Sequence, residues 1–140
     1  MKLLVIDGQG GRMGKAIVEQ LKKEVPEQEI TAIGTNSIAT STMLKAGADM
    51  AATGENPVIV NCQDADIIIG PIGIIASNSL LGEVTPRMAA AVSSSKAAKI
   101  LIPVKKCSIY VAGTQDLAIA EYVKLAVEQV KQMISGQMCQ

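Results

Sequence analysis

The segment from residue 4 to residue 14, LVIDGQGGRMG, restricts the fold more than any other part of the sequence. An aliphatic run ends at Asp7, and apolar side chains then recur at helical spacing as far as Glu24. Four glycines lie where the two patterns meet: Gly8, Gly10, Gly11 and Gly14. A buried strand that passes through a glycine turn into an amphipathic helix is typical of proteins with a parallel sheet covered by helices.

The remainder of the chain alternates between short apolar runs and helical patterns. Strands are predicted at residues 2–7, 29–34, 49–52, 66–70, 99–103 and 108–112, and helices at residues 11–24, 36–46, 55–61, 85–97 and 116–134. The link between the last two strands is too short for a parallel crossover, so the sixth strand is either antiparallel to the fifth or paired elsewhere. The predicted fold class is α/β, a Rossmann-like three-layer sandwich whose mostly parallel sheet has about six strands.

The size and the apolar composition fit this fold. A chain of 140 residues is predicted to form one Rossmann-like nucleotide-binding domain over residues 1–134, with a frayed tail at 135–140. Since the chain has no Phe or Trp and only two Tyr, its core must consist of aliphatic side chains and Met, which allow helices to pack closely on a sheet. The hydrophobic content of 49% also favours a homo-oligomer, in which a hydrophobic helix or an edge strand is covered.

The charge and hydropathy patterns exclude two kinds of partner. The formal net charge is zero and no basic cluster alternates with aromatic residues, so the chain is not expected to bind nucleic acid. The longest apolar run, residues 67–76, is interrupted by Gly70, Pro71 and Gly73 and is too short to span a membrane. The N-terminus enters a strand pattern directly, and we expect no signal peptide there.

The sequence is poor in metal ligands. It has no histidine and only three cysteines, Cys62, Cys107 and Cys139, without a Cys-x-x-Cys pair. No metal site is therefore predicted, and the cysteines are expected to be free thiols in a reducing cytoplasm.

The glycine turn predicts a phosphate site, because glycines between a strand and a helix have specific uses. The first glycine lets the chain leave the strand, the middle two let a diphosphate approach the backbone, and the fourth lets the helix pack on the sheet. The N–H groups of Arg12 and Met13 are expected to point at the anion, assisted by the helix dipole. The predicted cofactor is NAD or NADP, and the alternative is a tight turn that binds no ligand.

Asp7 is the residue that fits this prediction least well, because a bound diphosphate would lie close to its carboxylate and like charges repel. Three interpretations are open. The carboxylate caps N–H groups of the turn, or it holds a hydrated metal ion beside the phosphates. In the third, the ligand is neutral or cationic at this point and is not a dinucleotide.

The segment IDGQGGRMG resembles the Gly-x-x-Gly-Arg-Met-Gly turn of the dihydrodipicolinate reductases, nicotinamide-dependent enzymes of lysine synthesis. The resemblance implies that Gly8, Gly11, Arg12, Met13 and Gly14 hold the pyrophosphate. It covers about twenty residues and does not extend to the catalytic domain of those reductases, with its histidine-rich motif. As a whole, the chain is similar to a small bacterial family of Rossmann-like proteins with no assigned function.

The end of the second strand is where a nucleotide ribose would be bound. An acidic residue about twenty positions after the glycines would hold the ribose, and an arginine would suit a 2′-phosphate. The strand ends instead in Gly34, Thr35, Asn36 and Ser37, and the next basic residue is Lys45. Asn36 either contacts a ribose or caps the following helix. The pattern does not distinguish NAD from NADP.

Further candidate residues follow the fourth strand. If the first and fourth strands are neighbours, the GPIG segment faces the glycine turn across the crevice in which α/β sheets bind ligands. This segment consists of Gly70, Pro71, Ile72 and Gly73. Ser77, Asn78 and Ser79 would add polar groups to the same pocket. The alternative for GPIG is a loop with special backbone angles.

The sequence therefore predicts a small nucleotide-binding or NAD(P)-binding protein, and an oxidoreductase if the bound cofactor carries the chemistry. Tyr110, Lys105 and Asp7 are candidate proton donors, although none belongs to a recognisable catalytic pattern. The alternatives are a non-enzymatic dimeric regulatory or sensor module that binds a nucleotide, and an interaction protein whose glycine turn is empty.

Overall fold

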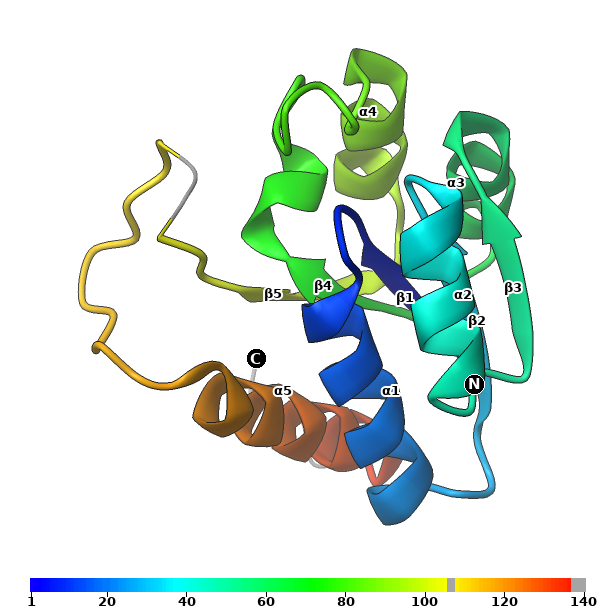
Figure 1. Ribbon diagram of the computed structural model, residues 1–140. Helices are drawn as coiled ribbons and strands as arrows, with labels where there is room; N and C mark the ends of the chain where they lie inside the picture. Colours follow the sequence, from blue (N-terminus) through cyan, green and yellow to red (C-terminus); the bar gives the residue numbers. More distant parts are fainter. Residues whose placement is uncertain (106–107, 137–140) are drawn as a thin grey trace.

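A computed structural model describes residues 1–105 and 108–136 of the chain (Figure 1). Five strands form one parallel sheet in the order β3-β2-β1-β4-β5. The strands are β1 (Lys2–Asp7), β2 (Glu29–Gly34), β3 (Met50–Thr53), β4 (Ile67–Pro71) and β5 (Ala98–Ile102). The helices are α1 (Arg12–Glu24), α2 (Ser37–Lys45), α3 (Glu55–Cys62), α4 (Pro86–Ser94) and α5 (Ile119–Ile134), with a 3₁₀ turn at Ile72–Ile75.

Helices cover both faces of the sheet, which confirms the predicted three-layer α/β fold. Successive side chains of β1 point to opposite faces, as in any strand. Leu3 and Val5 pack into a core with α1, α2 and α5, whereas Leu4 and Ile6 pack into a second core with α3 and α4. Figure 1 shows α1 and α5 side by side on the first face. Both cores are aliphatic, as the composition predicted.

The helix starts follow the capping residues in the sequence. The Asn36 side chain accepts a hydrogen bond from the Ala39 N–H group at 2.9 Å and caps α2. Thr85 accepts from the Met88 N–H group at 3.1 Å, and Pro86 occupies the first turn of α4. These two starts agree with the predictions to within a residue.

The predicted sixth strand is wrong. Residues 108–112 are irregular, and β5 is an edge strand of the five-stranded sheet. A strand needs hydrogen-bonding partners along its edge, and the short link after Pro103 does not bring this segment back beside β5. Figure 1 shows the segment between β5 and α5 looping away from the sheet before it returns.

Two predicted helices are shorter than expected. The predicted helix at 85–97 ends at Ser94, because the Ser95 hydroxyl donates to the Cys62 carbonyl at 2.6 Å and accepts from the Ala97 N–H group at 3.1 Å. Such side-chain hydrogen bonds compete with the helix. The predicted helix at 116–134 begins only at Ile119, and Asp116 forms an ion pair with Lys105 at 2.6 Å instead.

Some expectations lie outside the described residues. Cys107, Cys139 and positions 137–140 of the expected tail belong to this group. Among the described residues, none of the helices is both long and apolar enough to cross a membrane.

Candidate functional site

The candidate site lies at the carboxyl edge of the sheet, where β1, β2 and β4 end. β1 pairs with β2 on one side and with β4 on the other. The chain therefore leaves β1 and β4 in opposite directions along the sheet, and this switch point is where parallel α/β sheets bind ligands. Three segments meet there: the glycine turn at residues 8–11, the end of β2 at residues 35–36, and the loop at residues 76–84.

The structure gives each glycine of the turn its own role. Gly11 caps α1 in a left-handed conformation, with φ 73°, and a Cβ placed there would lie 2.8 Å from Ala39 Cα. A Cβ on Gly14 would lie 2.9 Å from the Asp7 Cβ, so this glycine allows α1 to pack against β1. Gly10 differs from both, because no atom lies within 4 Å of the position of its absent Cβ. Only at Gly10 does the turn leave open space for a ligand.

The Asp7 carboxylate caps N–H groups of the glycine turn, as the first of the three interpretations of this residue expects. Its side chain is 5% exposed and accepts hydrogen bonds from the N–H groups of Gly8 at 2.8 Å and Gly14 at 2.7 Å. Burial raises the pKa of Asp7, the hydrogen bonds from Gly14 and Gly8 lower it, and the nearby carboxylate of Glu83 raises it further. Among the described residues, no group of three acidic or sulfur ligands is placed to hold a metal ion.

Two N–H groups at the turn carry no hydrogen bond to any described residue: those of Gly10 and Arg12. The Arg12 side chain is exposed and makes no ion pair within the described chain. The helix dipole gives this end of α1 a partial positive charge. Of the two N–H groups predicted to point at an anion, that of Met13 interacts with the Asp7 carboxylate and lowers its pKa, whereas that of Arg12 carries no hydrogen bond to a described residue.

Glu83 is a site residue that the sequence did not reveal. Its Oε1 atom accepts from the Gln9 N–H group at 2.9 Å, the Thr35 hydroxyl at 2.6 Å and the Asn36 side-chain amide at 2.7 Å. Burial raises the pKa of Glu83, but the hydrogen bonds from Thr35, Gln9 and Asn36 hold it below its usual value. A carboxylate from the loop after β4 therefore lies at the ends of β1 and β2.

Asn36 is fully engaged in holding this arrangement. Besides capping α2, its side-chain amide donates to the Gln9 carbonyl at 2.9 Å and to Glu83. Both of its N–H donors therefore have protein partners. The helix-capping interpretation describes the structure, and no donor of Asn36 remains for a ribose.

The GPIG segment emerges at the same edge, because β4 is a direct neighbour of β1. Gly70 lies directly against the Ile6 carbonyl oxygen, and a Cβ on Gly73 would lie 3.2 Å from Ser79 Oγ. Pro71 ends β4, and Ile72 begins the 3₁₀ turn. The Ser79 hydroxyl donates to the Gly73 carbonyl. Close packing therefore explains both glycines of this segment, against the backbone of β1 at Gly70 and against the Ser79 side chain at Gly73.

A cavity of about 700 Å³ lies between the start of α1, the end of β5 and the start of α5. Met13, the second residue of α1, forms part of its wall together with the end of β5, the segment before α5 and the first turn of α5. Both tyrosines of the chain, Tyr110 and Tyr122, line it, and the rest of the lining is Pro103, Val104, Lys105, Ile109, Val111, Thr114, Gln115, Asp116, Leu117, Ala118 and Ile119. Its surface is mainly apolar.

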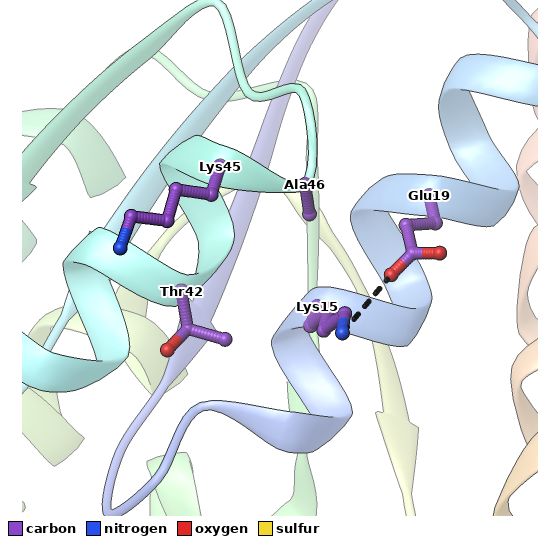
Figure 2. A pocket seen from close by; sticks show the side chains of 5 residues that line it. All are labelled: Lys15, Glu19, Thr42, Lys45 and Ala46. Atoms are coloured by element: carbon purple, nitrogen blue, oxygen red, sulfur yellow. Dashed lines mark ion pairs between the residues drawn. The ribbon is translucent and has the colours of Figure 1, made fainter.

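A second hollow, of about 410 Å³, lies between α1 and α2 (Figure 2). Lys15 and Glu19 of α1 face Thr42, Lys45 and Ala46 across it, and the Lys15 ammonium lies 3.9 Å from the Glu19 carboxylate. Both side chains of this ion pair are exposed, and the Glu19 carboxylate offsets one of the two positive charges of Lys15 and Lys45. The hollow is a surface groove whose lining is about equally polar and apolar.

The strand order and the glycine turn at the switch point define a Rossmann-like α/β protein. The chain belongs to the family described as Domain of unknown function (DUF3842), whose model matches residues 2–135. This agrees with the similarity to a small family without an assigned function that the sequence suggested. No curated protein sequence matches the chain.

Solved structures that resemble the chain include a decarboxylase and two structures of an arsenate reductase. A dodecameric FMN-dependent Ubix-like decarboxylase from Escherichia coli O157:H7 is 20% identical, with a TM-score of 0.49 over 94% of this chain and 77% of that chain. An arsenate reductase in the phosphate binding state is 16% identical, with a TM-score of 0.43 over 96% of this chain and 97% of the other. An arsenate reductase in the intermediate state is 12% identical, with a TM-score of 0.39 over 98% of both chains.

Proposed function

We propose that the chain binds a dinucleotide of the NAD(P) type across the carboxyl edge of its sheet. One observation carries the proposal: Met13, which follows the glycine turn as the second residue of α1, forms part of the wall of the cavity of about 700 Å³. An apolar cavity therefore begins next to the turn that we propose holds the phosphates. The cavity lies within the range of about 300–1,000 Å³ that is usual for small-molecule sites.

The phosphates are proposed to lie over Gly10. The N–H groups of Gly10 and Arg12 carry no hydrogen bond to a described residue, the Arg12 guanidinium is exposed, and no atom lies within 4 Å of the position of a Cβ on Gly10. Backbone donors at a helix start favour an anion by geometry and by the helix dipole. Asp7 is not an obstacle in this arrangement, because its charge is turned inward and is bonded to Gly8 and Gly14.

One ring of the ligand would then enter the cavity beside Met13. Tyr122 lies in the cavity wall with its hydroxyl donating to the Gln115 carbonyl. An apolar cavity with aromatic walls suits a planar heterocycle better than a sugar or a free acid. A bound nicotinamide would supply hydride-transfer chemistry, and the chain would orient the ring and exclude water.

The candidate proton donors are poorly placed for such chemistry. Asp7 lies beneath the turn, Lys105 pairs with Asp116 at 2.6 Å, and the Tyr110 side chain is 91% exposed. Binding without turnover, as in a regulatory or sensor module, is therefore the second candidate function. Oxidation of the reduced dinucleotide by an added hydride acceptor, such as an aldehyde or a ketone, followed at the dinucleotide's own absorbance band, would favour the first candidate over the second.

A thermal-shift panel of NAD⁺, NADH, NADP⁺, NADPH, ATP and AMP tests the proposal. A ligand at about 100 times its Kd should stabilise the fold by about 2.7 kcal/mol, which is a shift of several degrees. Gly10→Glu places a carboxylate over the free N–H groups and should weaken binding at least about tenfold. Gln63→Glu adds the same charge at the opposite edge of the sheet and should leave binding unchanged.

The outcome against the proposal is equally concrete. If no compound in the panel shifts the melting temperature, the glycine turn is architecture and the chain is an interaction protein. If a dinucleotide binds equally well to wild type and Gly10→Glu, the phosphates lie elsewhere.

We further propose that the chain self-associates through the rim of the cavity. Tyr110, Val111 and Ile119 line this rim and are 91%, 42% and 54% exposed. A second copy would bury these apolar side chains. Light scattering should give a dimer or larger assembly for wild type and a monomer for a Tyr110→Ser, Ile119→Ser double variant; a monomeric wild type would contradict the idea.

The buried free thiol of Cys62 favours a reducing compartment such as the cytoplasm.

A further inference from the structure

The end of β2 lacks an acidic residue in the sequence, but it does not lack a carboxylate in the structure. Glu83, from the loop at residues 76–84, accepts hydrogen bonds from Thr35 and Asn36 at the end of β2. In parallel α/β sheets, the ribose of a bound nucleotide lies at this point, beside the glycine turn. Glu83 therefore occupies the ribose-binding position from a different part of the chain.

One of the two carboxylate oxygens of Glu83 is available to a ligand. Three donors, from Gln9, Thr35 and Asn36, converge on Oε1, whereas Oε2 has no partner among the described residues. The Oε1 atom would lie 3.0 Å from a Cβ on Gly8, so Glu83 is held close to the turn that carries the proposed phosphate site. A carboxylate fixed through one oxygen presents the other in a defined direction.

The loop that delivers Glu83 is held in an unusual backbone conformation. Asn78, Leu80 and Leu81 have φ values of 66°, 54° and 58°, a region that leucine rarely adopts. The loop is closed by the Asn78 N–H group donating to the Val84 carbonyl at 2.7 Å and by the Val84 N–H group donating to the Ser79 carbonyl at 3.2 Å. Such conformations persist where the surrounding structure enforces them, and they concentrate at functional sites.

We propose that Glu83 Oε2 accepts hydrogen bonds from the 2′- and 3′-hydroxyl groups of a nucleotide ribose and thereby selects an unmodified ribose against a 2′-phosphorylated one. A 2′-phosphate would bring two negative charges against this carboxylate, and like charges in contact repel strongly. No Lys or Arg side chain within the described chain forms an ion pair with Glu83 to relieve that repulsion. This inference rests on the proposed dinucleotide function.

Isothermal titration of NAD⁺ and NADP⁺ into the purified chain tests the inference. The two ligands differ only in the 2′-phosphate, and wild type should bind NAD⁺ at least tenfold more tightly. Glu83→Gln keeps an acceptor oxygen for the three donors but removes the charge, and it should reduce the preference to less than threefold. Glu55→Gln is the matched control, because Glu55 accepts from the Thr85 hydroxyl at 2.6 Å and does not contact the turn; it should keep the preference of wild type.

Each outcome has a definite meaning. Equal affinity of wild type for the two ligands, or a preference for NADP⁺, overturns the role of Glu83 and leaves the proposed function standing. A preference that Glu83→Gln retains in full also overturns it. Binding of neither ligand overturns the proposed function and this inference together. The comparison within wild type needs no variant, so it decides the question even if Glu83→Gln fails to fold.

Discussion

Replacement of Asp7 by alanine removes the carboxylate that ties the end of β1 to the first turn of α1. The side chain is 5% exposed and accepts from the N–H groups of Gly8 at 2.8 Å and Gly14 at 2.7 Å. A buried N–H group left without a partner costs about 1–3 kcal/mol, and Asp7→Ala leaves two such groups. Removal of the buried charge of Asp7 is favourable and offsets part of this cost. We expect the free energy of unfolding to fall by about 2–4 kcal/mol at neutral pH.

Urea denaturation followed by far-ultraviolet circular dichroism measures this change, since the chain has no tryptophan for fluorescence. Asp7→Asn is the informative companion, because its single amide oxygen can accept one of the two N–H groups. The free energy of unfolding of Asp7→Asn should therefore lie between the values of wild type and Asp7→Ala. An Asp7→Ala protein as stable as wild type would refute the proposed capping role.

The pH dependence tests the electrostatic part of the same reasoning. Burial raises the pKa of Asp7 above its ordinary value of 3.8, and the N–H groups of Gly14 and Gly8 oppose this only in part. The folded chain then binds the proton more tightly than the unfolded chain does. The proton-linked part of the Asp7 contribution to stability is therefore complete below the ordinary pKa and is lost as the pH rises through the raised one, whereas the hydrogen bonds from Gly8 and Gly14 account for the loss expected at neutral pH. The stability difference between wild type and Asp7→Asn should shrink from acid to neutral pH, and a difference that grows would show that the hydrogen bonds outweigh burial.

Three further changes have simpler expected outcomes. Leu81→Asn should raise the free energy of unfolding by about 0.5–1 kcal/mol. Leu81 is 97% exposed with φ 58°, and asparagine tolerates this conformation better than leucine. A lower melting temperature for Leu81→Asn in a thermal melt would contradict the assigned backbone strain. Gly11→Val should lower the free energy of unfolding in urea by more than about 2 kcal/mol, because φ at Gly11 is 73° and the added Cβ would lie 2.8 Å from Ala39 Cα. Gly10→Ala should leave the free energy of unfolding within about 0.5 kcal/mol of wild type. Burial raises the pKa of Cys62 to about 11, so iodoacetamide at mildly alkaline pH should label Cys62 only after unfolding. Labelling of the native chain at Cys62 itself, located by peptide mass spectrometry that separates it from Cys107 and Cys139, would count against this.

The parts of the fold that depend on local pattern could be predicted from the sequence. The strand, turn and helix around Asp7 follow from hydrophobic period and glycine placement, and Asn36 and Thr85 mark helix starts because a side chain caps the backbone within three residues. The glycine turn was placed correctly at a sheet edge for the same reason. Whether these residues bind a ligand stays a prediction.

The parts that depend on distant partners could not be predicted. Residues 108–112 have the composition of a strand but do not pair with the edge strand β5, so their preference is not expressed. The carboxylate of Glu83 reaches the end of β2 only because the loop at residues 76–84 adopts left-handed angles at Leu80 and Leu81. Leucine gives no sequence signal for such angles, and this contact joins residues far apart in the chain.

The anchoring of the glycine turn by Asp7 and Glu83 has a kinetic consequence. Gly8, Gln9 and Gly14 already donate to these two carboxylates, so the backbone that would meet a phosphate is ordered before any ligand arrives. A preformed site loses little further conformational entropy on association. Association should then follow a single phase whose rate grows in proportion to ligand concentration without reaching a plateau, and ligands of different affinity should differ mainly in how long they remain bound.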